Sequence, residues 1–183
     1  MIYYGEKELA AAFRTVRKNT IQIAEDIPEN RYDFKASSDT RSIAQTLVHI
    51  ALGSEVPYYI HSNRIDDLMK VDFPQLIQKL AGEEAKARSK AEIIALLRAE
   101  GEKFALYLEG LSESFLAERV TMPPGAEPAT KSRFEMLLSP KEHEMHHRGQ
   151  LMVLQRLIGI VPHLTRQRQE QMARAQAAQR QAT

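Results

Sequence analysis

Apolar side chains recur at steps of three and four residues near the start of the chain, which is the spacing of one face of an α-helix. The stripe runs through Leu9, Phe13, Val16, Thr20, Ile23 and Ile27. Pro28 follows, and a proline cannot continue a helix because it lacks a backbone N–H. The pattern therefore predicts a helix that ends at Pro28, followed by a loop over the polar, turn-rich residues 28–40.

The same spacing returns further along the chain, at Ile43, Leu47 and Ile50. It predicts a second helix that begins near Ser38–Arg41 and ends or kinks at Pro57. Residues 61–88 are mixed in character: FPQLIQKL has the pattern of a short helix, and the rest is a charged connection. A connection of this length in a compact domain suggests a lid or a binding loop.

The third helix has the clearest start signal. Ser89 and Glu92 form a Ser-x-x-Glu capping box, in which each side chain satisfies a backbone N–H of the other residue. The apolar stripe that follows consists of Ile93, Leu97, Phe104, Leu108 and Leu111. Residues 112–130 contain MPPGAEP and are predicted to form a loop.

A fourth helix over about residues 131–158 is predicted to close at Gly159 and Pro162. The final stretch, 163–183, is rich in Gln, Arg and Ala without an apolar stripe, so it is interpreted as a solvated helix or a disordered tail. No segment shows the period-two alternation of a strand. The pattern therefore predicts an all-α protein, with a four-helix bundle over residues 1–162 and a polar C-terminal tail.

Composition narrows the classes of function. The net charge of +1 gives no global field for nucleic acid or membrane partners, and no aromatic residues accompany the arginines of the tail. The absence of cysteine excludes disulfides, thiolate ligands and cysteine nucleophiles, and fits a reducing compartment. MIYYGEKEL does not resemble a signal peptide, and no apolar run approaches the ~18–20 residues of a membrane span. We therefore expect a cytoplasmic protein.

Three of the six histidines lie in KEHEMHHRGQL, residues 141–151. His143 and His147 are one helical turn apart on one face, and Gln150 shares that face. The face continues as apolar surface through Leu151, Leu154 and Ile158. The histidines thus lie where the core stripe should be, and a polar pair there must be satisfied by a metal ion or by hydrogen bonds.

A catalytic zinc site usually has three protein ligands and an open position, so a third ligand must come from elsewhere. His49, in AQTLVHIAL of the second helix, is the candidate, because packed bundle helices can bring such residues together. His146 and Arg148 are rotated away and are expected to face solvent or to support a neighbour. His61 and His163 lie in predicted loops and are expected to be ordinary surface residues.

Pro140 lies just before the first histidine of the pair. A proline inside a helix removes a hydrogen bond, yet Ser139-Pro140-Lys141-Glu142 also has the pattern of a fresh helix start. The sequence predicts either one kinked helix or two abutting helices. Either arrangement would set the direction from which His143 approaches a metal.

Residues 143–147 also fit the His-Glu-x-x-His pattern of zinc proteases, in which the glutamate is the general base. The extended form of that motif needs a glycine and a histidine where this chain has Gln150 and Val153. Another form needs a downstream glutamate, and only Glu170 in the polar tail follows. The protease interpretation is therefore not favoured.

LVHIAL and HEMHHRGQL together resemble the DinB/YfiT-like superfamily, over about residues 5–160. The most specific element is His-x-x-x-His-Arg-Gly-Gln combined with a single histidine on the second helix, and DFKASSDTRSIAQTLVHI resembles the family's loop and second helix. The resemblance implies a four-helix bundle of up-down-down-up connectivity. It also implies a divalent ion, zinc or nickel, bound by His49, His143 and His147.

Some relatives are transferases or isomerases that use low-molecular-weight thiols, others have no assigned activity, and many are dimers. The resemblance therefore implies a metal-dependent thiol S-transferase or isomerase that acts on a small molecule, and a homodimer. The pocket is expected between the second and fourth helices, covered by residues 61–88. Glu144 and Gln150 are candidates for hydrogen bonds that orient a ligand or a histidine.

Three alternatives stay open. In the first, the protein is a non-catalytic metal-binding bundle that acts as a sensor or interaction module. In the second, it catalyses metal-assisted hydrolysis with the same ligands. In the third, the three histidines are satisfied core residues that bind no metal.

Overall fold

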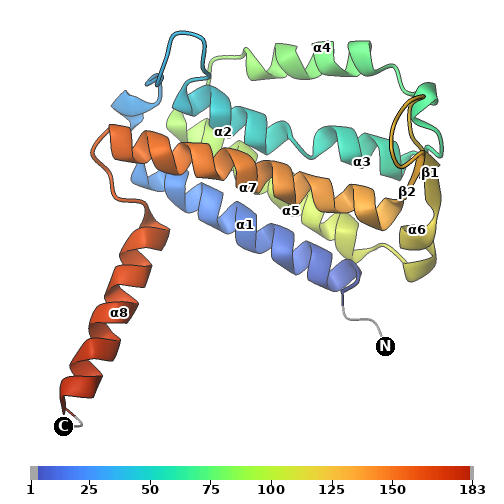
Figure 1. The fold of residues 1–183 in the computed structure, drawn as a ribbon. Helices are drawn as coiled ribbons and strands as arrows, with labels where there is room; N and C mark the ends of the chain where they lie inside the picture. The colour runs from blue at the N-terminus through green and yellow to red at the C-terminus, as the bar shows by residue number, and fades with distance from the viewer. Residues whose placement is uncertain (1–3, 182–183) are drawn as a thin grey trace.

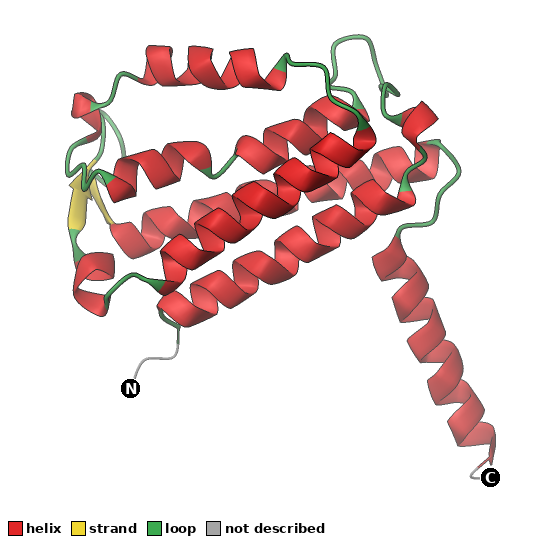
Figure 2. Cartoon of the chain, turned by 180° about the vertical axis from the view of Figure 1, so that it is seen from behind, coloured by secondary structure: helices red, strands yellow, loops and turns green. Residues whose placement is uncertain are grey.

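The computed structural model describes residues 4–181 and shows an all-α fold built on a four-helix bundle (Figures 1 and 2). The helices of the bundle are α1 (Glu6–Asp26), α2 (Ile43–Leu52) continued by α3 (Glu55–Ser62), α5 (Lys90–Glu109) and α7 (Arg133–Leu157). Short 3₁₀ turns at Glu29–Arg31 and Leu68–Lys70 lie in the connections.

The bundle has the up-down-down-up connectivity that the resemblance implies. In Figure 1, α1 runs from right to left and α2 and α3 return from left to right. Helix α4 (Phe73–Glu84), the short helix predicted from FPQLIQKL, then carries the chain back along the outside of the bundle, next to α2. As a result α5 runs in the direction of α2, and α7 runs in the direction of α1.

Helix starts follow the capping signals. The predicted box at Ser89 and Glu92 begins α5, as expected. The second helix begins at Ile43, so the predicted start near Ser38–Arg41 is wrong. Ser42 caps it, because the Ser42 Oγ accepts from the Gln45 N–H at 3.2 Å and the Gln45 Oε1 accepts from the Ser42 N–H at 2.9 Å.

Neither Pro57 nor Pro140 ends a helix. Pro57 lies in the first turn of α3, where backbone N–H groups have no acceptor within the helix, so the missing N–H of proline costs no hydrogen bond. Pro140 is buried inside α7, which continues through it, so the alternative of two abutting helices is wrong. Leu137 before Pro140 and Glu144 after it are both buried in the core, and this packing on either side outweighs the local cost of the proline.

A small hairpin corrects the expectation that residues 112–130 form a loop without strands. Helix α6 (Glu113–Ala117) is followed by β1 (Arg119–Thr121), which pairs antiparallel with β2 (Thr130–Ser132). Strands of three residues are too short to show the alternation by which a strand is recognised in a sequence.

Helix α8 (His163–Gln181) projects away from the bundle in both views, so of the two alternatives for the tail the solvated helix is found (Figures 1 and 2). Arg166 ties its first turn to Asp26 of α1 at 2.7 Å, and residues 167–180 are exposed. The last two residues of the predicted tail, and residues 1–3 of the N-terminal stretch, lie outside the described residues. Within 4–181, every helix is too short or too polar to span a membrane.

Candidate metal centre

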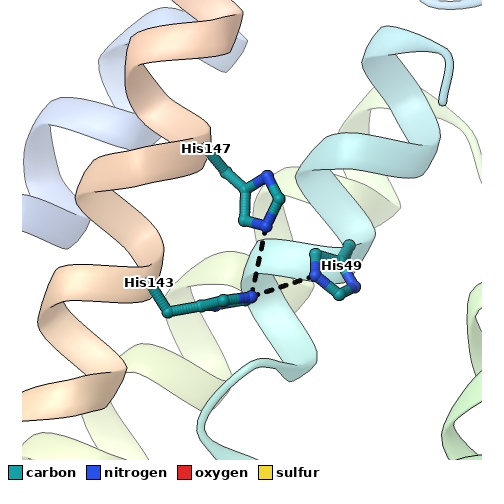
Figure 3. A group of neighbouring side chains, drawn as sticks. All are labelled: His49, His143 and His147. Carbon is teal, nitrogen blue, oxygen red and sulfur yellow. Dashed lines mark hydrogen bonds between the residues drawn. The ribbon is translucent and has the colours of Figure 1, made fainter. Parts of the chain in front are cut away.

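Three imidazoles meet between α2 and α7 (Figure 3). The Nε2 atom of His143 lies 3.0 Å from Nε2 of His49 and 3.2 Å from Nε2 of His147. Two nitrogen ligands at ~2.0–2.1 Å from one tetrahedral ion would lie about 3.3–3.4 Å apart. The structure therefore brings the three predicted histidines together: these two distances are close to the spacing of ligands on a single ion, and the nitrogens of all three lie within 4.8 Å of one another.

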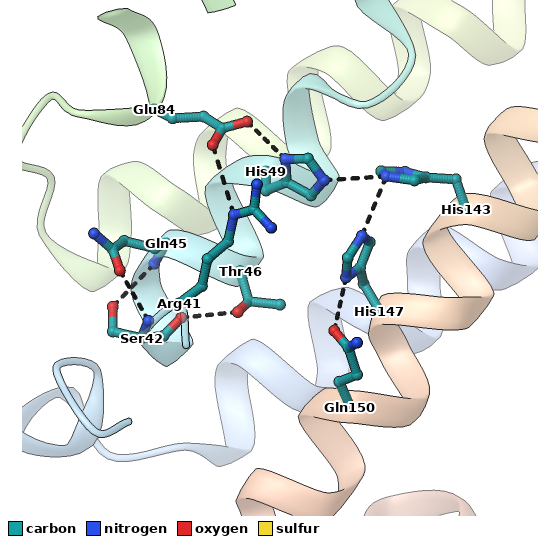
Figure 4. A network of polar contacts seen from close by, with 9 residues as sticks. All are labelled: Arg41, Ser42, Gln45, Thr46, His49, Glu84, His143, His147 and Gln150. Atoms are coloured by element: carbon teal, nitrogen blue, oxygen red, sulfur yellow. Dashed lines mark hydrogen bonds and ion pairs between the residues drawn. The ribbon is translucent and has the colours of Figure 1, made fainter. Parts of the chain in front are cut away.

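Each of two histidines is oriented by a partner on its other nitrogen (Figure 4). The Nδ1 of His49 lies 2.6 Å from a carboxylate oxygen of Glu84, and the Nδ1 of His147 lies 2.8 Å from Oε1 of Gln150. A carboxylate can only accept, so Nδ1 of His49 carries the proton. The Gln150 amide nitrogen faces Nε2 of His146 at 3.2 Å, which leaves its oxygen to accept from His147.

These tautomers decide whether the residues fit a metal ion. Because His49 and His147 hold their protons on Nδ1, both present bare Nε2 lone pairs to Nε2 of His143. A single N–H on His143 can donate well to only one of them. The Nε2 lone pair of the other histidine then faces Nε2 of His143 without a hydrogen bond of its own. A cation at the point of convergence would satisfy all three, and three neutral imidazoles are a donor set for zinc, nickel, iron or copper. The residues fit a divalent metal ion.

The protonation states favour the same conclusion. Burial, followed by the neighbouring His147 and His49, lowers the pKa of His143 to about 4. Burial also lowers the pKa of His147, and the charge of Arg41 acts in the same direction on both groups. These two imidazoles are therefore neutral at neutral pH, which is the form that binds a metal.

Gly53, just after α2, makes room for the ring of His143. A Cβ atom at this position would lie 2.8 Å from Nδ1 and 3.0 Å from Cε1 of His143. Its φ of −62° is open to any residue, so the backbone does not require glycine here. The missing side chain instead lets the His143 ring lie against the turn between α2 and α3.

Glu144 does not orient a histidine, and that expectation is corrected. It is 1% exposed, and its two carboxylate oxygens accept from Nε of Arg17 at 3.0 and 3.1 Å. The same guanidinium donates to the backbone oxygens of Leu97 at 2.8 Å and Ile50 at 3.2 Å. Since a general base must reach the water that it deprotonates, a glutamate buried in this ion pair cannot act as the base of a zinc protease.

Two other histidines were expected on the surface, and both are buried. His61 is 1% exposed and its Nδ1 accepts from Arg133 at 3.2 Å, while His163 is 4% exposed and faces Asn19 at 3.2 Å. His146 is exposed and lies 3.2 Å from the Gln150 amide nitrogen, in line with the expectation that it faces solvent or supports a neighbour. Arg148 is only partly exposed, and its Nε is buried.

A cavity of about 690 Å³ opens beside His147 and Gln150. Thr46 of α2 and Leu154 of α7 line its floor, and loop residues 39–41 line its rim. The cavity lies between the second and last bundle helices, as expected, but Ala36 and residues 39–41 line it in place of residues 61–88. From residues 61–88 the site instead receives Glu84, which the sequence did not single out.

Comparison with known proteins agrees with this architecture. The family model of the DinB superfamily matches residues 12–151. A DinB-like protein from Bacillus subtilis, YjoA, is 23% identical with a TM-score of 0.60, over 83% of this chain and 92% of its own. An uncharacterized protein from Clostridium difficile 630 is 13% identical with a TM-score of 0.65, over 86% and 99%.

YfiT from Bacillus subtilis is described as a probable metal-dependent hydrolase with an unusual four-helix bundle topology. It is 13% identical with a TM-score of 0.65, over 87% of this chain and 91% of its own. At these identities the solved structures show a shared fold only. No curated protein matches the chain. The family model spans more than half of the sequence and coincides with the bundle and all three histidines, so the chain belongs to the DinB superfamily.

Proposed function

We propose that His49, His143 and His147 bind one divalent metal ion, zinc or nickel, and that the protein is a metal-dependent enzyme. The reaction proposed is transfer of a low-molecular-weight thiol to an electrophile, or isomerisation assisted by such a thiol. The observation that carries the proposal is the convergence of bare Nε2 lone pairs beside a cavity large enough for a small molecule.

When bound, the ion would supply Lewis-acid chemistry: a coordinated thiol loses its proton outright, and a coordinated water becomes more acidic. The chain's own residues prepare the site for it. Glu84 and Gln150 hold the tautomers of His49 and His147, and such outer partners fix ring orientation and ligand basicity. The cavity beside His147 holds the substrate, and no cysteine of the protein is needed.

Thiol chemistry is favoured over hydrolysis by the state of the two glutamates near the histidines. Glu144 is paired with Arg17 and Glu84 with His49, so neither carboxylate is free to take a proton from substrate or water. A thiol that loses its proton on coordination needs no such base. Hydrolysis is the second candidate, because YfiT, which shares the fold, is described as a probable metal-dependent hydrolase.

Elemental analysis of protein purified without chelator tests the centre. About one equivalent of metal is expected in the wild type, with loss in His49→Ala. His146→Ala is the matched control, because this histidine lies on the same helix as two proposed ligands but outside the group. Metal that stays at full occupancy and affinity in His49→Ala would remove His49 from the site.

Turnover of a thiol with a chlorodinitrobenzene electrophile separates the remaining alternatives. Metal-dependent consumption of the thiol, absent from His49→Ala, would support the transferase. Stoichiometric metal without turnover of thiols or esters, together with a metal-linked change in oligomeric state, would favour a sensor or interaction module. No metal even after reconstitution would leave three histidines that are core residues only.

A further inference from the structure

The cavity beside His147 has a polar rim and an apolar wall. Val153 and Leu154 of α7 form the wall, and the guanidinium of Arg41 lies at the rim, near the histidines (Figure 4). A small molecule in this cavity therefore has both Arg41 and His147 among its neighbours. The question is which polar groups of the cavity are free to bind it.

Most hydrogen-bond donors that line the cavity are already used. The hydroxyl of Thr40 donates to the backbone oxygen of Ser37 at 2.8 Å. The hydroxyl of Thr46 donates to the backbone oxygen of Ser42, also at 2.8 Å. The amide of Gln150 bridges His147 and His146. These side chains shape the cavity but offer few donors to a ligand.

Arg41 is different. Its one polar contact within residues 4–181 is an ion pair with Glu84, with Nε 3.8 Å from the carboxylate oxygen. That distance exceeds a hydrogen bond, so the guanidinium keeps its donors for another partner. The side chain is 49% exposed, which makes it accessible from the cavity. The other oxygen of Glu84 is 2.6 Å from His49 Nδ1, so the carboxylate is already hydrogen-bonded to a second side chain.

The shape of a guanidinium selects its ligand. Its planar fork of N–H groups matches a carboxylate with two parallel hydrogen bonds. A doubly charged phosphate is the poorer match, because Asp39 at the same rim and Glu84 behind it place two negative charges close to the single arginine. These two acids repel a singly charged carboxylate less than a doubly charged phosphate.

We propose that Arg41 binds a carboxylate of the substrate, so that the protein acts on small thiols that carry a carboxylate group. The inference rests on the proposed function, because the thiol of the same molecule would reach the metal centre. One carboxylate oxygen of Glu84 faces Arg41 and the other faces His49. A ligand that reaches from Arg41 to the histidines is therefore short. Val153 and Leu154 would contact its apolar stem.

The test compares two thiols of equal length on cobalt-loaded protein, with thiolate-to-cobalt absorption as the readout. 3-Mercaptopropionate carries the carboxylate, and 3-mercapto-1-propanol replaces it with a hydroxyl. The wild type is expected to bind the acid at least about tenfold more tightly than the alcohol, as for a hydrogen bond to a charged group. Arg41→Gln should lose this preference and bind the alcohol as before.

Two further variants sharpen the result. Arg41→Lys keeps the charge but loses the fork, so it should retain only part of the preference. Lys35→Gln removes one positive charge from the same loop, outside the cavity, and should retain all of it. An unchanged preference in Arg41→Gln, or an equal loss in Lys35→Gln, would overturn the assignment. Cobalt content is measured for each variant, so binding is compared at equal loading.

A second readout separates this inference from the proposed function. If cobalt-loaded protein binds neither thiol, the thiol-transfer proposal fails, and Arg41 is then tested in metal-free protein. The side-chain ¹⁵N resonance of Arg41, assigned by its loss in Arg41→Gln, is followed during titration with the singly charged butyrate and with neutral butyramide. A shift with butyrate alone would support the carboxylate site, and the absence of a shift would overturn it.

Discussion

Glu84 and His49 share a hydrogen bond of 2.6 Å between α4, which lies outside the bundle, and α2, which lies within it. Carboxylate–histidine pairs of this kind orient a metal-binding imidazole and make it more basic. The helix that returns the chain along the bundle thus has a second role, because its last residue fixes the rotamer and tautomer of one proposed ligand.

Replacing Glu84 should weaken metal binding without removing a ligand. Glu84→Ala is expected to lower metal affinity by about 10–100-fold, the usual cost of losing an outer partner. Glu83→Ala is the matched control, since Glu83 pairs with Lys86 and Arg88 and does not contact the histidines. Competition with a chromophoric chelator measures both. Equal affinities in the two variants would show that the carboxylate does not orient His49.

Gly53→Ala should disturb the centre through His143. The new Cβ would meet Nδ1 of His143 at 2.8 Å, so the ring must move, and a loss of roughly tenfold in metal affinity is expected. Gly149→Ala is the control on α7, because a Cβ there meets nothing within 4 Å. That variant should keep its metal affinity and gain about 0.5–1 kcal/mol of helix stability. Thermal unfolding and chelator competition on both variants give the comparison.

Glu144→Ala should affect folding rather than chemistry. It would leave the buried guanidinium of Arg17 without its carboxylate, and breaking a buried pair costs about 3–5 kcal/mol of unfolding free energy. Glu142→Ala, at an exposed position of the same helix, should change it by less than about 0.5 kcal/mol. Urea unfolding of metal-free protein measures both. A Glu144 variant of normal stability but without turnover would restore the general-base interpretation.

His61 should make stability depend on pH. Burial, then the charge of Arg133, lowers its pKa from 6.5 to about 4, so between these values the unfolded chain binds a proton that the folded protein excludes. The contribution of neutral His61 to the free energy of unfolding is therefore fully present above pH 6.5. It declines as the pH falls and is lost near pH 4, a total decrease of about 3 kcal/mol.

The non-titrating variant for this test is His61→Asn, whose side-chain oxygen can still accept from Arg133. Urea unfolding of metal-free wild type and variant across the same pH range should show a steeper slope in the wild type. Identical slopes would mean that His61 is not buried as a neutral group.

How far the site could be predicted depends on how local its contacts are. His143 and His147 lie on one helix, so their proximity follows from the helical repeat, and the sequence predicted it. His49 required the packing of two helices, and only the bundle pattern and the family resemblance pointed to it. The structure brings its ring to His143, while metal binding by the group remains the proposal stated above.

The missed features are those that depend on distant partners. Glu84 lies 35 positions from His49, and their contact exists only because α4 crosses outside α2. His61 was assigned to the surface from its predicted loop, but Arg133, 72 positions later, covers it. The same holds for His163 and Asn19, 144 positions apart. Local polarity gave no signal of such tertiary contacts, which decide burial.

The separation of the proposed ligands along the chain also sets an order of events during synthesis. His49 precedes His143 by 94 positions, so a polypeptide growing on the ribosome exposes its first imidazole long before the other two have been made. The point where the three nitrogens converge is created only when α7 has emerged and docked on α2. Any ion that the site takes up is therefore acquired by a nearly finished domain, and a nascent chain cannot use it to nucleate folding.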